Sequence, residues 1–261
     1  MSLAFVEDWL ASLKSHCSPQ IYADCLGRSG FSPDLFRQRN VRVTHDQIVA
    51  LYRHVAVSTG DEMMGLWSRP IRSGALKYIC TVVLEASSMR TALFRFVQFW
   101  NLLLDDYRLE LVVDETYVAI RLLPRMPNQR IHRFGHMLLL KLAHGMFSWL
   151  AGRELPLRHV VFSFPRPAFA EDYPVIFPAS IGFGEAFSAI FFERSVEDMP
   201  LERRIVDMRS FLERAPRDWI FTKFNEHALQ LRVREIIYAS QMMDCRLEQV
   251  ANTLNFLLPG P

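Results

Sequence analysis

The sequence predicts an α+β fold in which a helical N-terminal segment precedes an antiparallel sheet packed with helices, and an all-α tail follows. From Met89 to Leu104, apolar residues recur every three to four positions, as on the buried face of a helix. Directly after it, apolar and polar residues alternate from Tyr107 to Val113 and again from Val118 to Leu122, which is typical of a half-buried hairpin. Hairpins joined to helices in this order favour α+β over a doubly wound parallel sheet.

The residues before this helix are expected to be mostly helical. Apolar residues recur at helical spacing from Phe5 to Leu13, from Ile21 to Leu26 and from Thr44 to Val57, and Thr44 is placed to cap the third helix. The segment from Gly74 to Leu84 is instead rich in β-forming residues, so it predicts a strand. The pair Ser87-Ser88 then predicts the cap of the following helix.

After the hairpin, the pattern predicts another apolar helix from about His132 to Ala151 and a strand from His159 to Phe164. The stretch from Pro165 to Phe192 is rich in prolines and aromatics and is expected to mix loops with short strands. Within it, Gly182-Phe183-Gly184-Glu185 predicts a plain turn rather than a phosphate-binding loop, because the third glycine position holds Phe187.

Composition bounds the class of protein. The chain has 261 residues, half of them hydrophobic, so a sizeable core is expected. Its net charge is only +2, without the basic excess of a complete nucleic-acid-binding domain. The most apolar window, Met137 to Ala151, is short and contains Lys141 and His144, so no membrane segment is predicted. The start of the chain lacks the pattern of a signal peptide, and a cytoplasmic location is expected. Free thiols are predicted for all four cysteines: Cys17, Cys25, Cys80 and Cys245.

The C-terminal residues predict the beginning of a helix-turn-helix. A helix is predicted from Leu229 to Tyr238, and a second one follows. The second carries small and apolar residues on one face, at Leu247, Val250, Ala251 and Leu254. Asn255 suits a tight turn, but the chain then reads Phe256-Leu257-Leu258-Pro259-Gly260-Pro261, and Pro-Gly-Pro does not continue a helix. We therefore expect a helix-turn-helix without its recognition helix.

These C-terminal segments resemble the junction into the DNA-binding domain of AraC/XylS-type bacterial transcription regulators. The resemblance rests on Asp207 to Pro216, Arg232 to Ile237 and Leu247 to Leu254. Upstream, the chain resembles the arabinose-binding-type sensor domain of one branch of that family. That second resemblance is carried by Gly74 to Tyr78, by Ala92, Leu93 and Phe96, by the hairpin around Asp114, and by Tyr173 to Phe183 followed by Met199-Pro200-Leu201.

The resemblance implies three parts and a regulatory function. Residues 1–205 are expected to form an effector-sensing and oligomerisation domain, residues 206–228 a linker helix region, and residues 229–261 a truncated helix-turn-helix. The implied partners are a small-molecule effector, a second copy or a related regulator, and DNA in full-length members. Because its helix-turn-helix lacks the recognition helix, this chain is not expected to bind DNA specifically by itself.

Two other hypotheses stay open at this stage. The chain could be a stand-alone interaction module that pairs with a full-length regulator and inhibits it, or a small-molecule-binding protein or cryptic enzyme without a regulatory role. No nucleophile elbow, Walker lysine or His-Asp-Ser constellation is present, so no catalytic residue, cofactor or enzyme activity is predicted.

The candidate binding residues follow from composition rather than from a motif. Tyr78, Trp100 and His136 are predicted to contact the effector, since ligand pockets are mostly apolar with a few polar anchors. The alternative is that such aromatics are ordinary core residues.

Arg121 and Arg125 lie in a basic stretch and are predicted to contact an anion, with a solvated loop as the alternative. His132 and His136 have the spacing of two metal ligands on a helix, and His144 follows, but no further ligand is evident and no metal is predicted.

Overall fold

The computed structural model describes residues 1–37, 41–127, 129 and 132–221. The remnant of the helix-turn-helix predicted at Leu247, Val250, Ala251 and Leu254, and with it Cys245, lies outside these residues.

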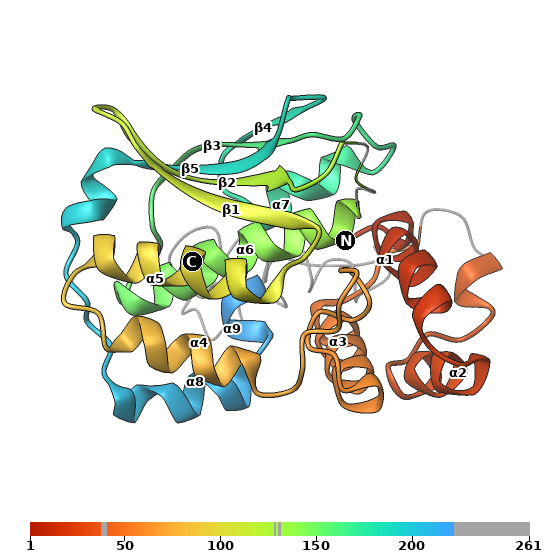
Figure 1. Ribbon diagram of the computed structural model, residues 1–261. Helices are drawn as coiled ribbons and strands as arrows, with labels where there is room; N and C mark the ends of the chain where they lie inside the picture. Colours follow the sequence, from red (N-terminus) through yellow and green to blue (C-terminus); the bar gives the residue numbers. More distant parts are fainter. Residues whose placement is uncertain (38–40, 128, 130–131, 222–261) are drawn as a thin grey trace, which may run out of the picture.

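A five-stranded sheet forms one layer, and helices pack against one of its faces (Figure 1). The strands are β1 (Tyr107–Val113), β2 (Tyr117–Pro124), β3 (Leu157–Phe162), β4 (Ser180–Phe183) and β5 (Ser188–Glu193). Their order in the sheet is β1-β2-β5-β3-β4. The predicted α+β class is confirmed.

The helices divide into an N-terminal group and a group beneath the sheet. The first group, red to orange at one side of Figure 1, is α1 (Leu3–His16), α2 (Pro19–Arg28), the short η1 (Leu35–Arg37) and α3 (His45–Thr59). The second is α4 (Ala75–Leu84), α5 (Met89–Leu103), α6 (Arg133–Leu150), α8 (Met208–Arg214) and α9 (Arg217–Ile220). Short turns of helix are η2 (Ala170–Asp172), α7 (Tyr173–Ile176), η3 (Arg194–Asp198) and η4 (Ile205–Asp207).

Several local predictions are confirmed. Thr44 caps α3 in a capping box, in which its hydroxyl accepts from the Gln47 amide and the Gln47 side chain accepts from the Thr44 amide. Ser88 caps α5 by accepting a hydrogen bond from the Thr91 amide. The hairpin has the predicted alternation, with Leu109 opposite Leu122 and Leu111 opposite Ile120. At Gly184 the chain turns with a positive φ of 76°, as the plain-turn interpretation requires.

The prediction of a strand from Gly74 to Leu84 is wrong, because these residues form α4. Its inward residues Ile79, Cys80 and Val83 are spaced for a helix and fully buried, so packing overrides β-propensity. The helix start is also fixed from a distance, since the Glu62 carboxylate accepts hydrogen bonds from the amides of Gly74 and Leu76 at 2.6 and 2.7 Å.

The sequence predicted an antiparallel sheet, but the sheet contains one parallel pair of strands. The ladders β1–β2, β2–β5 and β3–β5 are antiparallel, whereas β3 and β4 run parallel. The physical reason is the connection: residues 163–179, which include η2 and α7, are long enough to return the chain to the same end of the sheet before β4 begins.

Helix α6 is the centre of the molecule, because every residue from Phe134 to Leu150 is buried. Three of its buried polar side chains, Lys141, His144 and Ser148, have hydrogen-bond partners close by. The Lys141 Nζ lies 3.2 Å from His144 Nδ1, the His144 Nε2 lies 3.1 Å from the Leu155 carbonyl oxygen, and the Ser148 hydroxyl accepts from the Leu155 amide. These contacts offset the cost of placing polar groups in an apolar core.

Residues 206–221, which the sequence assigns to the linker helix region, pack onto this core. Phe211 of α8 stacks on Trp149 at 4.3 Å, and Trp219 of α9 is fully buried. At Gly145 of α6 an added Cβ would lie 2.2 Å from the Trp219 carbonyl oxygen, so the two helices touch through their backbones.

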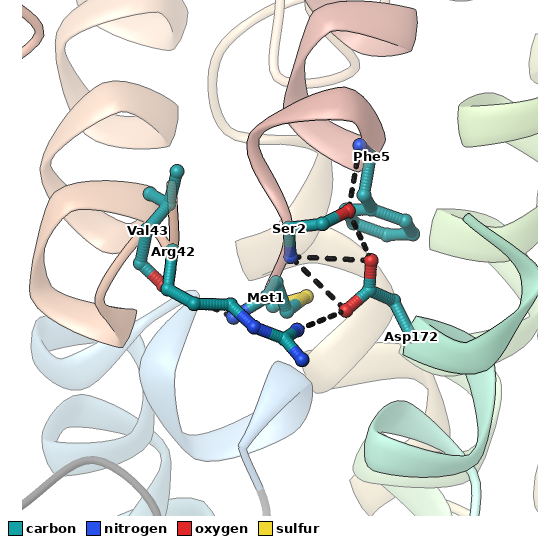
Figure 2. Close-up of polar contacts among 6 residues, drawn as sticks. All are labelled: Met1, Ser2, Phe5, Arg42, Val43 and Asp172. Atoms are coloured by element: carbon teal, nitrogen blue, oxygen red, sulfur yellow. Dashed lines mark hydrogen bonds and ion pairs between the residues drawn. The ribbon is translucent and has the colours of Figure 1, made fainter. Parts of the chain in front are cut away.

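Asp172 joins the N-terminal helices to the sheet layer (Figure 2). Its carboxylate accepts hydrogen bonds from the Ser2 amide at 3.0 Å, from the Ser2 hydroxyl, and from Arg42 at 3.0 Å. Ser2 is the N-cap of α1, and Arg42 precedes α3. Next to it, Met1 and Val43 exchange two backbone hydrogen bonds. One buried side chain therefore holds three separate segments together.

We expect Asp172→Asn to lower the free energy of unfolding by about 1–3 kcal/mol, because a buried carboxylate with several donors is replaced by an amide that leaves some of them unpaired. Urea denaturation measures the change. Glu171→Gln is the matched control: its side chain is 85% exposed, so a change within about 0.5 kcal/mol is expected. Equal losses in the two variants would contradict the role given to Asp172.

Candidate functional site

A cavity of about 420 Å³ lies where α1, the start of α6 and the segment after β3 meet. It is lined by Asp8, Ala11, Ser12, Leu66, His132, Arg133, Phe134, Phe164 and Pro165. Both the N-terminal helices and the sheet layer contribute walls. A molecule bound there would therefore contact both parts of the fold.

Helix α1 presents one face to this cavity, since Asp8, Ala11 and Ser12 are three and four residues apart. Trp9, the neighbour of Asp8, stacks on Phe134 of α6 with ring centroids 4.9 Å apart. This stack fixes α1 against α6. The Ser12 hydroxyl donates to the Gly65 carbonyl and lies 3.3 Å from His132 Nδ1.

The start of α6 supplies the cationic side of the cavity. Its N-cap, His132, makes no side-chain capping hydrogen bond, so the first-turn amides give this end of the helix a partial positive charge. Arg133 adds a full charge, paired with Asp8 across the cavity wall. Gly135 permits the close approach here, because an added Cβ would lie 3.2 Å from the Leu66 Cβ.

His136 lies one turn further along α6, behind this wall. Its ring contacts Phe164, a lining residue, with centroids 6.3 Å apart, and lies parallel to Trp67 at 6.0 Å. His136 Nδ1 is 2.8 Å from the Ser188 hydroxyl, while His136 Nε2 is buried without a hydrogen-bond partner among the described residues. Burial, together with the neighbouring His132, lowers the pKa of His136 to about 3, so the ring is neutral at physiological pH.

The structure does not bring the three predicted effector contacts together. Tyr78 is 68% exposed on α4. Trp100 is buried on α5, where its ring contacts are Phe96 and Phe99. His136 is the one of the three that adjoins the cavity. Their role as effector contacts stays a prediction.

The two predicted anion contacts are also apart. Arg125 donates to the main-chain carbonyls of Asn101, Leu104 and Tyr107, so it fastens the end of α5 to β1. Arg121 lies over the Phe187 ring at 4.9 Å and 4.0 Å from Glu110. Anion binding by either residue stays a prediction, and Arg125 would have to release these carbonyls to take part.

The sequence places His132 and Arg133 in the same basic stretch as Arg121 and Arg125, but it does not predict that Asp8 and Ser12 join them in one site. A local signal was present: Ser12 is a polar residue at a buried position of α1, between Leu10 and Leu13. Its partner could not be found in the same way, because Ser12 and His132 are 120 positions apart.

No group of three or more His, Cys, Asp or Glu side chains in the described part of the chain is arranged to hold a metal ion. None of the described helices combines the length and the apolar character needed to cross a membrane.

Residues 22–201 match the family described as the arabinose-binding domain of AraC transcription regulator, N-terminal. This match covers more than half of the chain. The chain belongs to the AraC family. Helix α1, with Asp8, Ala11 and Ser12, precedes the matched residues, so one wall of the cavity is contributed from outside them.

Among solved structures, the chain is similar to the transcriptional regulator CdpR from Pseudomonas aeruginosa. The two are 15% identical with a TM-score of 0.41, and the alignment covers 97% of this chain and 74% of that one. No curated protein matches the chain.

We predict that acidification destabilises this AraC-family protein through His136. Because the folded-state pKa is lowered to about 3, the unfolded chain binds a proton as the pH falls below about 6.5 while the folded protein does not. Stability is therefore lost as the pH falls through this window, by about 2 kcal/mol between pH 7 and pH 5 at about 1.4 kcal/mol per pH unit.

His136→Phe should remove this pH dependence, whereas a variant of the exposed His16, His16→Gln, should keep it. Urea denaturation at pH 5, 6 and 7 measures the difference. A gap between wild type and His136→Phe that stays constant over this range would contradict the prediction.

Proposed function

We propose that this chain senses a small-molecule effector for an AraC-type transcription regulator, and that the effector binds in the cavity at the start of α6. The observation that carries the proposal is the cavity itself, which lies between the N-terminal helices and the sheet layer. A ligand that contacts two parts of a fold changes their relative stability, which is the requirement for a sensor. Acting on transcription, the protein would work in the cytoplasm.

The cavity has the properties of a small-molecule site. Its volume of about 420 Å³ lies within the usual range of roughly 300–1,000 Å³ for ligand pockets. Leu66, Phe134 and Phe164 provide apolar surface, while Ser12, His132 and Arg133 provide polar groups that can orient a ligand. The mixture suits a small polar metabolite, and arabinose is the first compound to test because the family is described as arabinose-binding.

Helix α6 offers a route from the cavity toward the C-terminal residues. The cavity is at its first turn, and Gly145, twelve residues after Arg133, touches the backbone of Trp219 in α9. Helix α3 also contacts residues 213–221. Arg53 donates hydrogen bonds to the carbonyls of Glu213 and Ala215, and His45 stacks on Phe221. A shift of α1 or α6 on effector binding would be transmitted to residues 222–261, where the sequence predicts the start of the DNA-binding part.

We infer no specific DNA contact within residues 1–221. The chain has Lys+Arg 30 against Asp+Glu 28, which is not the charge of a protein that binds DNA strongly through phosphate contacts. We infer that the chain senses its effector and that DNA reading needs a complete DNA-binding domain, in the same polypeptide or in a paired regulator.

We expect Ala11→Trp to abolish the effector response. Ala11 is an exposed lining residue, so an indole at this position fills the cavity without displacing core side chains. Ala4→Trp is the matched control, because Ala4 is exposed on the same helix two turns earlier and does not line the cavity. Thermal unfolding would be followed with arabinose, other sugars, amino acids and small carboxylic acids.

A compound that raises the melting temperature of wild type and Ala4→Trp should bind Ala11→Trp at least about 100-fold more weakly, a loss of about 2.7 kcal/mol. Its ability to bind all three proteins equally would place the effector site elsewhere and refute the proposed cavity.

We expect the chain to bind the DNA upstream of its own gene no more tightly than unrelated DNA of the same length. A complete regulator prefers its own site by about 10³-fold or more. Fluorescence anisotropy over a salt series, with a version extended by a complete AraC-type DNA-binding domain as the positive control, measures the ratio. Specific binding by the unextended chain at physiological salt would contradict this prediction, because it would show that the chain itself recognises the DNA sequence.

A further inference from the structure

We propose that β1 is a dimerisation strand, which pairs with β1 of a second copy of this chain through the backbone groups of Leu111 and Val113. This inference deepens the proposed function by naming the surface through which two sensors would pair. Strand β1 is at the edge of the sheet, with β2 as its neighbour on one side. An exposed edge is a template for pairing with another chain unless it is covered.

The backbone groups that face outward from β1 can be identified. In an antiparallel pair, alternate residues bond to the neighbouring strand and the residues between them point away from it. The side-chain amide of Asn101 bonds both the Leu109 amide, at 2.7 Å, and the Leu109 carbonyl, at 2.9 Å. The backbone amide and carbonyl of Leu109 therefore point away from β2. Those of Leu111 and Val113, two and four residues later, point the same way.

Within the part of the chain that the structure describes, the first half of this edge is covered and the second half is open. Arg125 donates to the Tyr107 carbonyl at 3.1 Å, and Asn101 occupies both groups of Leu109. The outward amides and carbonyls of Leu111 and Val113 have no hydrogen-bond partner among the described residues. Side chains thus close the edge up to Leu109 and leave a short stretch of free strand.

A groove of about 670 Å³ runs beside this free stretch, between β1 and α5. The helix contributes one face, made of Arg90, Thr91, Phe94, Val97, Gln98 and Asn101. Phe94 is 54% exposed there, which is unusual for a large apolar side chain. The groove therefore offers room for an added strand together with an apolar side chain to cover it.

The free groups are self-complementary. If a two-fold axis passes through Val112, Leu111 lies opposite the partner's Val113 and Val113 opposite the partner's Leu111. The two pairs then exchange four backbone hydrogen bonds, and these use all of the free groups on this stretch. Leu111 and Val113 also bring apolar side chains to each other and to Phe94 of the facing helix.

The charges near this stretch are balanced in the same register. Glu110 would lie opposite the partner's Asp114, a like-charge pair. Arg108 is 3.8 Å and Arg121 4.0 Å from Glu110, so two basic side chains lie beside this acidic pair. The repulsion is compensated, and the occupant that matches both the free groups and the charges is a second copy.

Sedimentation velocity of the full chain, without DNA or effector, tests the proposal. Phe94→Lys should raise the dimer dissociation constant by at least about 10-fold, because the covering ring is replaced by a charge. Leu102→Lys is the matched control: Leu102 is on the same helix and 76% exposed, but does not line the groove, so the dimer should persist.

A disulfide tests the register. Val112 would face its own copy at a Cα separation of about 4.5 Å, which a disulfide can span, so Val112→Cys should form a covalent dimer under mild oxidation. Glu110→Cys should not, because two copies of residue 110 would be separated by about four residues, or roughly 13 Å. Wild-type protein serves as the control, because it shows how much covalent dimer the native cysteines form.

Two results would overturn the proposal. One is a chain that stays monomeric at all concentrations, even if a peptide or another protein binds in the groove. The other is a dimer that is unchanged in Phe94→Lys and gives no disulfide in Val112→Cys, which would place the interface on another surface. Neither result bears on the effector cavity, whose test follows ligand binding in variants of α1.

Discussion

The rest of this structure depends on the complete burial of α6. A helix surrounded by protein on all sides must find a partner for every polar side chain that it carries, since water cannot supply one. His136, Lys141, His144 and Ser148 are all buried on α6: His136 contacts Ser188 of β5, His144 and Ser148 contact the backbone of Leu155, and Lys141 contacts His144 of the same helix. These partners fix the rotation of the helix, and through it the sheet, the cavity and the position of α9.

The burial of Lys141 shows how far this constraint reaches. Its ammonium group has His144 as a hydrogen-bond acceptor and the face of Phe177 at 5.7 Å. Burial lowers the pKa of Lys141 to about 8, and Glu154 opposes part of that shift. A buried charged group with few partners lowers the free energy of unfolding at neutral pH. In return, it can favour one packing arrangement around the central helix over others.

Two of the contacts that attach the N-terminal helices to this core are made by Trp9 and Asp172, and the cavity lies beside the first of them. Trp9 stacks on Phe134 next to the cavity, and Asp172 gathers Ser2 and Arg42 (Figure 2). The cavity wall beside Trp9 contains polar contacts between the two parts, from Ser12 to His132 and from Asp8 to Arg133. The arrangement places polar contacts where two parts of the fold meet, which is where a bound ligand can change their relative stability.

The sequence by itself determined what depends on neighbours along the chain. The period of two from Tyr107 to Leu122 specified the hairpin and its register, because a slip of one residue would turn its apolar face to water. The caps at Thr44 and Ser88 were readable because their partners are three residues away. The family was recognisable for a similar reason, since its motifs occur in order along the chain.

The tertiary structure decided what depends on residues far apart. Gly74 to Leu84 became a helix because its apolar face is buried and the distant Glu62 holds its first turn. The parallel pairing of β4 depended on the path of the connection before it. The cavity required α1 to meet α6 across more than a hundred residues, as in the contact of Ser12 with His132. Such contacts leave no periodic signal in the sequence, because they arise only when separate elements are packed together.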